Sequence, residues 1–228
     1  MMLGSAPRSG DCPGDPQGAA GPRREREQWY RRRHLQRELH DGAALRISAL
    51  TLRLGLLRHR ALPELPADAD GPAVQDSIGE LQDELHAVLE ELRDVAAKIY
   101  PPLLDEAGLG PALRGVADQL QLPVAVVASG ERFGPAAEGA AYFAVADLLA
   151  SLPGARAVPG AQAVELGVRR EGDQLVLSVS GIDACRAELH AELIDDRARP
   201  LGGTVDVANV VGGVRSDAST ITARFPCE

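Results

Sequence analysis

Apolar residues recur at helical spacing through the first part of the chain. From Arg23 to about Arg60 there is no proline, and the apolar positions follow one another at intervals of three or four residues. Such intervals place side chains on one face of a helix, so the pattern predicts one long helix with a single apolar stripe. The stripe consists of Leu35, Leu39, Ala43, Ile47, Leu50, Leu54 and Leu57.

A second apolar stripe follows the proline-rich segment 62–72 and runs to about Tyr100. Its intervals alternate between four and three residues, which is the pattern of a heptad seam. Two seamed helices joined by a short connection predict an antiparallel hairpin, and a second copy can cover the apolar positions that one hairpin leaves exposed. We therefore expect a homodimer in which two hairpins form a four-helix bundle. The seam positions are Val74, Ile78, Leu81, Leu85, Val88, Leu92, Val95 and Ile99.

Strand and helix patterns alternate after Pro101 and Pro102. We predict helices near 109–121, 135–151 and 184–199, and strands near 123–128, 162–169, 174–180, 203–210 and 218–225. Helices interleaved with a mixed sheet make an α/β layer, so the fold class of the whole chain is α+β. The expected divisions are a disordered tail over 1–22, the helical hairpin over 23–104 and the α/β domain over 105–228.

Composition and charge narrow the function classes. The net charge of −9 opposes binding to nucleic acid, although the arginine-rich run 23–33 leaves a basic patch as a less favoured alternative. The three cysteines are scattered and lack metal-ligand spacing, which is typical of free thiols. No apolar run has the length of a membrane span, so we expect a cytoplasmic protein without a metal site.

Four stretches of the chain carry a resemblance to one family. Residues 31–57 contain Glu-Leu-His-Asp at 38–41 and resemble the dimerisation and phosphoacceptor helix of a subgroup of sensor histidine kinases. The Pro-Pro-Leu-Leu linker within 92–113, the helix 140–149 and the Leu-Gly-Gly turn within 199–207 are similar to later parts of the same proteins. The resemblance covers about residues 23–228, and it implies a two-component signalling protein that binds a response regulator.

The resemblance implies that His40 is the phosphoacceptor and that Asp41 orients its ring and takes its proton. His40 comes one residue after the seam position Leu39, so it lies about 100° around the helix and points away from the seam. The subgroup places a glutamine that orients a hydrolytic water five residues after the histidine. Leu45 occupies that position here and has no group that can orient water, so dephosphorylation by that route should be weak.

The positions that bind ATP in the family carry other residues here. The resemblance puts Asp147 at the position of a glutamate and Ser151 at that of an asparagine that holds Mg²⁺. The three positions of an Asp-x-Gly-x-Gly turn fall on Gly181, Asp183 and Cys185. We therefore expect a degenerate histidine-kinase-like ATP-binding domain over 105–228, with an α/β sandwich fold and no cofactor.

The glycine-rich phosphate lid of the family is also missing from the sequence, because no glycine occurs between Ile182 and Leu201. The leading hypothesis is a pseudokinase that acts through His40 as a histidine phosphotransferase or a response-regulator-binding dimer. Two alternatives stay open. One is an active kinase that autophosphorylates His40 with an atypical ATP site, and the other is a non-catalytic scaffold that pairs with an active histidine kinase.

Overall fold

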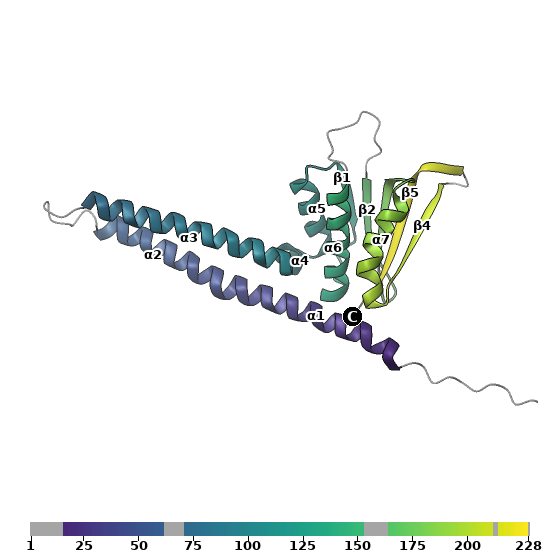
Figure 1. Cartoon of the computed structure of the whole chain (residues 1–228), viewed down its shortest axis with the longest axis horizontal. Helices are drawn as coiled ribbons and strands as arrows, with labels where there is room; N and C mark the ends of the chain where they lie inside the picture. Colours follow the sequence, from purple (N-terminus) through teal and green to yellow (C-terminus); the bar gives the residue numbers. More distant parts are fainter. Residues whose placement is uncertain (1–15, 62–70, 153–163, 212–213, 228) are drawn as a thin grey trace, which may run out of the picture.

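The chain forms a long helical hairpin joined to a compact α/β unit (Figure 1). The computed structural model describes residues 16–61, 71–152, 164–211 and 214–227. The α+β fold class predicted from the sequence is confirmed.

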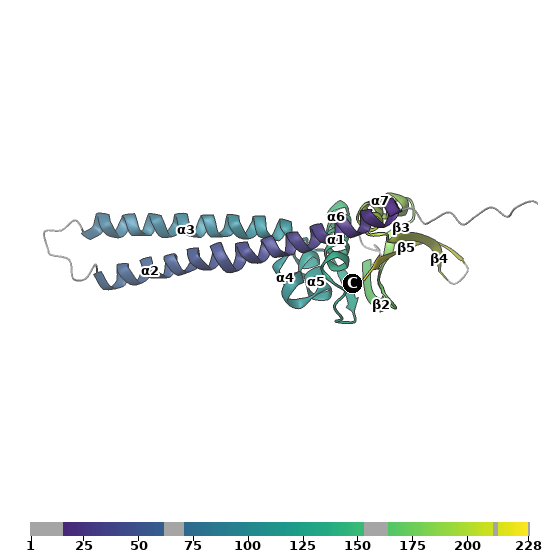
Figure 2. The ribbon, with the colours of Figure 1, turned by 90° about the horizontal axis from the view of Figure 1, so that it is seen from below.

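The hairpin consists of one long helical rod and a second helix that runs antiparallel to it (Figures 1 and 2). The rod comprises the α-helix α1 (Pro16–Arg37), a π-helical segment η1 (Glu38–Ala44) and the α-helix α2 (Leu45–Ala61). The returning helix is α3 (Gly71–Ile99). The predicted pair of long helices is confirmed, and most of the predicted connection between them lies outside the described residues.

The predicted stripe on α3 divides between two faces. Ile78, Leu85, Leu92 and Ile99 are half-buried and lie in the same seam as the buried Leu89 and Ala96. The other four predicted members, Val74, Leu81, Val88 and Val95, are 43–49% exposed. These four follow one another at intervals of seven, so they form a second apolar row beside the seam that joins the two helices of the hairpin.

The buried face of the first rod also differs from the predicted stripe. Leu35, Leu50 and Leu57 are exposed, whereas Gln36 and Ala44 are buried. These two residues are eight positions apart in the sequence, and two turns of an α-helix take only about seven. The π-helical segment η1 accommodates the extra residue, because its turn is wider than that of an α-helix.

Helix α1 begins at Pro16, before the expected start at Arg23. Residues 16–22 were predicted to belong to a disordered tail, but they are helical, and residues 1–15 lie outside the described part. The helix contacts the 3₁₀ turn η3 (Arg199–Leu201), and Pro22 lies close to Gly202, which follows that turn. The start of α1, which has few apolar side chains to bury, is therefore helical next to a segment that is distant in the sequence.

The C-terminal unit is a five-stranded sheet with helices on one face (Figure 2). The strand order is β1-β2-β3-β5-β4, with β1 parallel to β2 and the other neighbours antiparallel. Every helix and strand predicted for this unit is present, with ends that differ by a few residues. The elements are α4 (Pro102–Ala107), α5 (Leu109–Gln119), β1 (Val124–Ala128), α6 (Pro135–Ser151), β2 (Val164–Glu171), β3 (Gln174–Asp183), α7 (Ala187–Ala198), β4 (Thr204–Val211) and β5 (Val214–Pro226).

The core of this unit lies between the sheet and helices α5, α6 and α7. Alternate strand residues such as Leu177 and Ile221 are fully buried there, as the period of two in a strand requires. Two aromatic side chains from the hairpin, Trp29 of α1 and Tyr100 at the end of α3, belong to the same buried cluster. The first helix is therefore packed into the core of the C-terminal unit.

Candidate functional site: the His40 segment and its connections

His40 and Asp41 lie in η1, where the structure brings their side chains together. His40 Nδ1 is 3.1 Å from Asp41 Oδ1, and the two side chains are 42% and 71% exposed. An ionised carboxylate only accepts hydrogen bonds, so His40 Nδ1 carries the hydrogen and donates a hydrogen bond to Asp41. The other ring nitrogen, Nε2, then keeps its lone pair and can act as a nucleophile.

Leu45, the first residue of α2 and the residue that the sequence analysis placed at the position of a water-orienting amide, is an exposed apolar side chain. A π-helical turn before it contains both His40 and Asp41, and single π turns are frequent at functional sites.

Two arginines of α1 hold one carboxylate of the linker helix α4. Arg33 Nε donates to Asp105 Oδ1 at 2.5 Å, and Arg37 donates through Nε to Oδ2 at 2.6 Å and through Nη2 to Oδ1 at 3.1 Å. Burial acts to raise the pKa of Asp105, but the hydrogen bonds and charges of the two arginines outweigh it and lower that pKa overall. We call this arrangement the Asp105 clip. Our sequence analysis missed it.

A second charged group fastens α4 to the C-terminal unit. Glu138 of α6 is fully buried, and Arg132 donates to it through Nε and Nη2, both at 2.8 Å. The backbone N–H of Phe133 donates to the same carboxylate at 2.8 Å. Arg132 also donates to the backbone carbonyls of Leu104 and Asp105, at 3.3 and 3.0 Å, so it satisfies two groups of α4.

Trp29 fastens α1 to helix α6. Its ring is 2% exposed, and its centroid lies 5.8 Å from that of Phe143. A Cβ atom placed on Gly139 would come within 2.6 Å of the indole ring, so this position accepts Trp29 because it has no side chain. The guanidinium of Arg32 lies over the indole ring, 4.5 Å from its centroid.

The two residues of α6 that the resemblance placed at ATP-site positions are engaged with helix α7. Asp147 is paired with Arg197 at 2.9 Å. Ser151 Oγ donates to the carbonyl of Leu148 at 2.6 Å and lies 3.2 Å from His190 Nδ1, which therefore donates to the hydroxyl. Burial lowers the pKa of His190, and the charge of Arg186 lowers it further, so this ring is neutral at neutral pH.

The other two residues that the resemblance placed at ATP-site positions lie at the end of β3. Gly181 has a φ of +83° and marks a bulge where the pairing of β3 with β5 shifts register. Asp183 Oδ1 accepts a hydrogen bond from the backbone N–H of Cys185 at 2.9 Å and so shapes the turn into α7. These four positions thus serve local structure, on elements separate from the one that carries His40 and Asp41.

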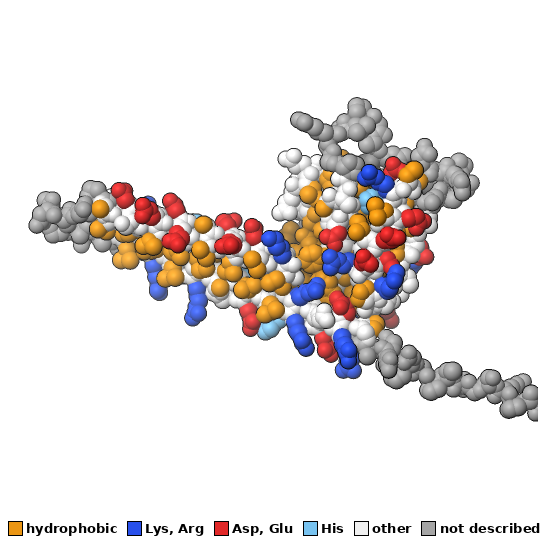
Figure 3. Space-filling view, in the orientation of Figure 1, with side chains coloured by type: hydrophobic (Ala, Val, Ile, Leu, Met, Phe, Trp, Pro, Cys, Tyr) orange, Lys and Arg blue, Asp and Glu red, His pale blue; other side chains and the backbone are white. Residues whose placement is uncertain are grey.

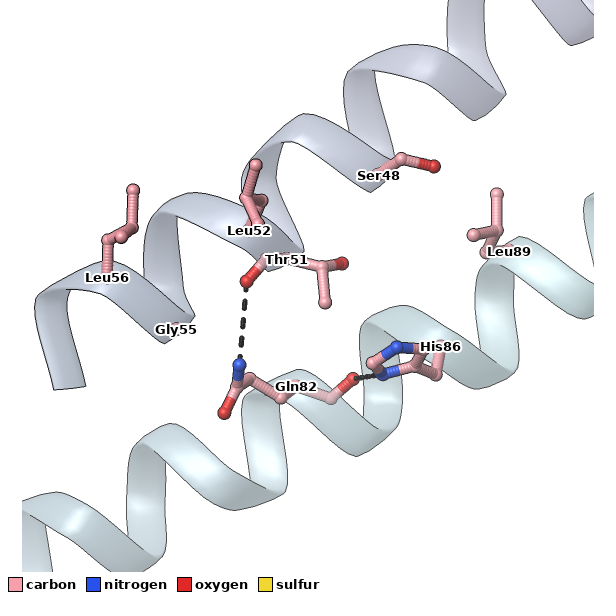
Figure 4. A pocket seen from close by; sticks show the side chains of 8 residues that line it. All are labelled: Ser48, Thr51, Leu52, Gly55, Leu56, Gln82, His86 and Leu89. Atoms are coloured by element: carbon pink, nitrogen blue, oxygen red, sulfur yellow. Dashed lines mark hydrogen bonds between the residues drawn. The ribbon is translucent and has the colours of Figure 1, made fainter. Parts of the chain in front are cut away.

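A groove of about 410 Å³ lies between α2 and α3, farther along the hairpin (Figure 4). Gln82 reaches α2 beside Gly55, where its Nε2 is 3.5 Å from the carbonyl of Thr51. His86 donates from Nδ1 to the carbonyl of Gln82 at 2.8 Å. Apolar side chains complete the groove, whose lining is Ser48, Thr51, Leu52, Gly55, Leu56, Gln82, His86 and Leu89.

Among the described residues, no three His, Cys, Asp or Glu side chains are grouped so that they could hold a metal ion. In the same part of the chain, no helix combines the length and the apolar character that crossing a bilayer requires.

Three solved structures that are similar to this chain are histidine kinases, with low sequence identity and TM-scores below 0.5. The blue-light activated histidine kinase of Erythrobacter litoralis EL346 is 15% identical with a TM-score of 0.42, and the match covers 79% of this chain and 60% of that one. The mycobacterial sensor histidine kinase MprB is 13% identical with a TM-score of 0.32, covering 51% of this chain and 91% of that one. The Acinetobacter baumannii histidine kinase AdeS is 12% identical with a TM-score of 0.36, and the match covers 78% of this chain and 95% of that one.

A search of curated proteins finds no match to this chain. A family model described as histidine kinase does match, over residues 31–104. That range includes η1 and most of the hairpin, together with the linker residues up to Leu104. Over residues 31–104, which include His40 and Asp41, this chain is therefore similar to the histidine kinase family.

Proposed function

We propose that the chain is a two-component signalling protein of the pseudokinase type, which exchanges a phosphoryl group with a response regulator through His40. The observation that carries the proposal is the geometry of the His40 pair. Asp41 accepts the Nδ1 proton, and the half-exposed ring keeps a nucleophilic Nε2.

The transfer requires little from this chain beyond that imidazole. The Nε2 lone pair attacks the phosphorus of the regulator's aspartyl phosphate, and the bond from phosphorus to the aspartyl oxygen breaks. Asp41 takes the Nδ1 proton, so the phosphorylated ring does not retain a positive charge. The Mg²⁺ and the groups that stabilise the transferring phosphoryl belong to the regulator in this scheme.

The contacts of the former ATP-site positions support the absence of kinase activity. Ser151 replaces an amide oxygen ligand of Mg²⁺, and its hydroxyl is already engaged with Leu148 and His190. Asp183 is engaged with the backbone of its own turn, and Gly181 has no carboxylate to accept from an adenine amino group. These residues do not fit Mg²⁺-ATP.

The exposed apolar rows of the hairpin support a homodimer. Val74, Leu81, Val88 and Val95 form the row on α3, and Leu45, Leu52 and Leu56 are exposed on α2. Figure 3 shows apolar side chains along much of the hairpin. Surfaces of this kind are typically covered by another helix, and a second hairpin would complete a four-helix bundle.

The test uses purified chain with radiolabelled ATP and Mg²⁺, alone and with an active histidine kinase plus its response regulator. The variant His40→Gln removes the acceptor, and His34→Gln is a matched control because His34 is an exposed histidine of α1 that pairs with Glu38. We expect label on wild type and on the control only when the phosphorylated regulator is present, and none on His40→Gln.

Two other results would identify the alternatives. Label from ATP alone would mean that the chain is an active kinase with an atypical nucleotide site. No label under either condition, with binding to the regulator retained in both variants, would mean that the chain is a scaffold and that the phosphotransfer proposal is wrong.

A further inference from the structure

The Asp105 clip lies one helical turn from the His40 pair. Arg37 is four residues before Asp41 on the same rod, a spacing at which oppositely charged side chains normally pair. The Asp41 charge does act on the Arg37 guanidinium and contributes to raising its pKa, but the hydrogen bond to Asp105 is the larger cause. Arg37 therefore has two carboxylates within reach of its charge, and it is bonded to Asp105.

The relative exposure of the two carboxylates explains which one holds Arg37. The side chain of Asp105 is 10% exposed, whereas that of Asp41 is 71% exposed. Water screens the pair with Asp41 more strongly, so the attraction to Asp105 is the greater. Asp105 also accepts two hydrogen bonds from Arg37 in a fork and a third from Arg33, whose side chain is 24% exposed.

We propose that Asp105 is a positioning residue for His40: by holding Arg37 it leaves the Asp41 carboxylate available to His40 Nδ1. Without Asp105, Arg37 turns to Asp41 and competes with the imidazole for the same oxygens. His40 then loses its Nδ1 acceptor for part of the time, and the tautomer with the proton on Nε2 gains population. That tautomer has no lone pair on Nε2 and cannot attack phosphorus.

The clip also connects the His40 segment with the C-terminal unit. Asp105 belongs to α4, and Arg132 bonds to the backbone carbonyls of Leu104 and Asp105 while it is paired with the buried Glu138 of α6. Displacement of α4 would release Arg37 towards Asp41. The inference rests on the proposed function. It gives the C-terminal unit a role in positioning Asp105, and this role does not require nucleotide.

The experiment measures the tautomer of His40 in the full-length chain by the ¹⁵N chemical shifts of its ring, at a pH where the ring is neutral. The ring signals are assigned with His40→Gln. We expect Asp105→Asn to lower the population ratio of the Nδ1–H to the Nε2–H form about two-fold, because an exposed ion pair of this spacing shifts an equilibrium by that amount. The rate of phosphoryl transfer to His40 should fall by a similar factor.

The double variant Arg37→Gln/Asp105→Asn distinguishes competition from structural damage. With Arg37 gone, Asp41 has no competing partner, so we expect the tautomer ratio and the transfer rate to return to those of wild type. A loss that persists in the double variant would overturn the inference, as would an unchanged tautomer ratio in a folded Asp105→Asn protein.

Arg37→Gln by itself keeps the inference testable if Asp105→Asn does not fold, because Arg33 still holds Asp105 in that variant. Its tautomer ratio should equal that of wild type, and a two-fold decrease would mean that Arg37 itself supports Asp41. If wild type accepts no phosphoryl group from any donor, the proposed function fails, while the ring shifts still decide whether Asp105 controls the His40 pair.

Discussion

Substituting Gly139 by alanine tests the contact that joins the first helix to the C-terminal unit. The added Cβ would lie 2.6 Å from Cε3 and Cζ3 of Trp29 and 3.2 Å from Cε2 of Tyr100. Ordinary contacts between carbon atoms are about 3.5–4.0 Å, so the indole has to move.

Two effects of opposite sign determine how much Gly139→Ala changes the free energy of unfolding. Replacing a glycine inside a helix by alanine stabilises the folded state by about 1 kcal/mol. Inserting a methyl group into a filled core costs typically 1–3 kcal/mol, and the rigid indole offers little relief. We therefore expect Gly139→Ala to lower the free energy of unfolding by up to about 2 kcal/mol.

The matched control is Gly79→Ala in α3, where an added Cβ meets no heavy atom within 4 Å. This substitution has the helix-propensity gain without the clash, so we expect stabilisation by about 0.5–1 kcal/mol. Urea unfolding followed by circular dichroism measures both variants.

Trp29 provides a direct second measurement, because it is the single tryptophan of the chain and is 2% exposed. In Gly139→Ala we expect its emission to shift to longer wavelength and its quenching by acrylamide to increase, with no change in Gly79→Ala. Stabilisation of Gly139→Ala by as much as Gly79→Ala, with Trp29 emission unaltered, would refute the packing of α1 against α6.

Three further predictions concern other contacts. Leu81→Glu places a charge in the exposed row of α3 and should halve the mass measured by light scattering. Glu84→Ala on the same helix should leave that mass unchanged, and a monomeric wild type would contradict the dimer. Arg132→Met leaves the fully buried carboxylate of Glu138 without its charged partner, so it should lower the free energy of unfolding by about 3 kcal/mol in urea titrations, and a neutral effect would mean that the pair is not closed in solution. The pKa of Asp105 is lowered from its ordinary 3.8, so its stabilising contribution is present above that pH and is lost as the pH falls through the lower folded-state value. Asp105→Asn should therefore reduce the dependence of the melting temperature on pH below about 4, and identical pH profiles for the two proteins would argue against the clip.

The sequence by itself predicted the elements and singled out His40 and Asp41. Intervals of three and four residues identified the two long helices, and alternation identified the strands of the second half, because both periods follow from local backbone geometry. His40 and Asp41 are neighbours in the chain, so their juxtaposition needed no knowledge of the tertiary fold. The α+β class followed from the order of those elements.

The tertiary structure decided which faces of these elements meet. Apolar spacing could not separate Leu85, which lies in the hairpin seam, from Leu81, which is exposed, since both satisfy the same heptad pattern. The wider turn at η1 lets Gln36 and Ala44 lie on the same buried face of the rod. Which face is buried depends on the helices packed against the rod, so the sequence of the rod alone does not determine it.

The connections around His40 also needed the fold. Arg33 and Asp105 are 72 residues apart in the chain, and Trp29 meets Gly139 over a still longer separation. An arginine run and a linker aspartate each have many possible partners in a sequence. Chain folding selects among them by bringing α1 and α4 together, so that Arg33 and Arg37 both meet Asp105. Burial of Asp105 then makes these ion pairs stronger than their exposed competitors.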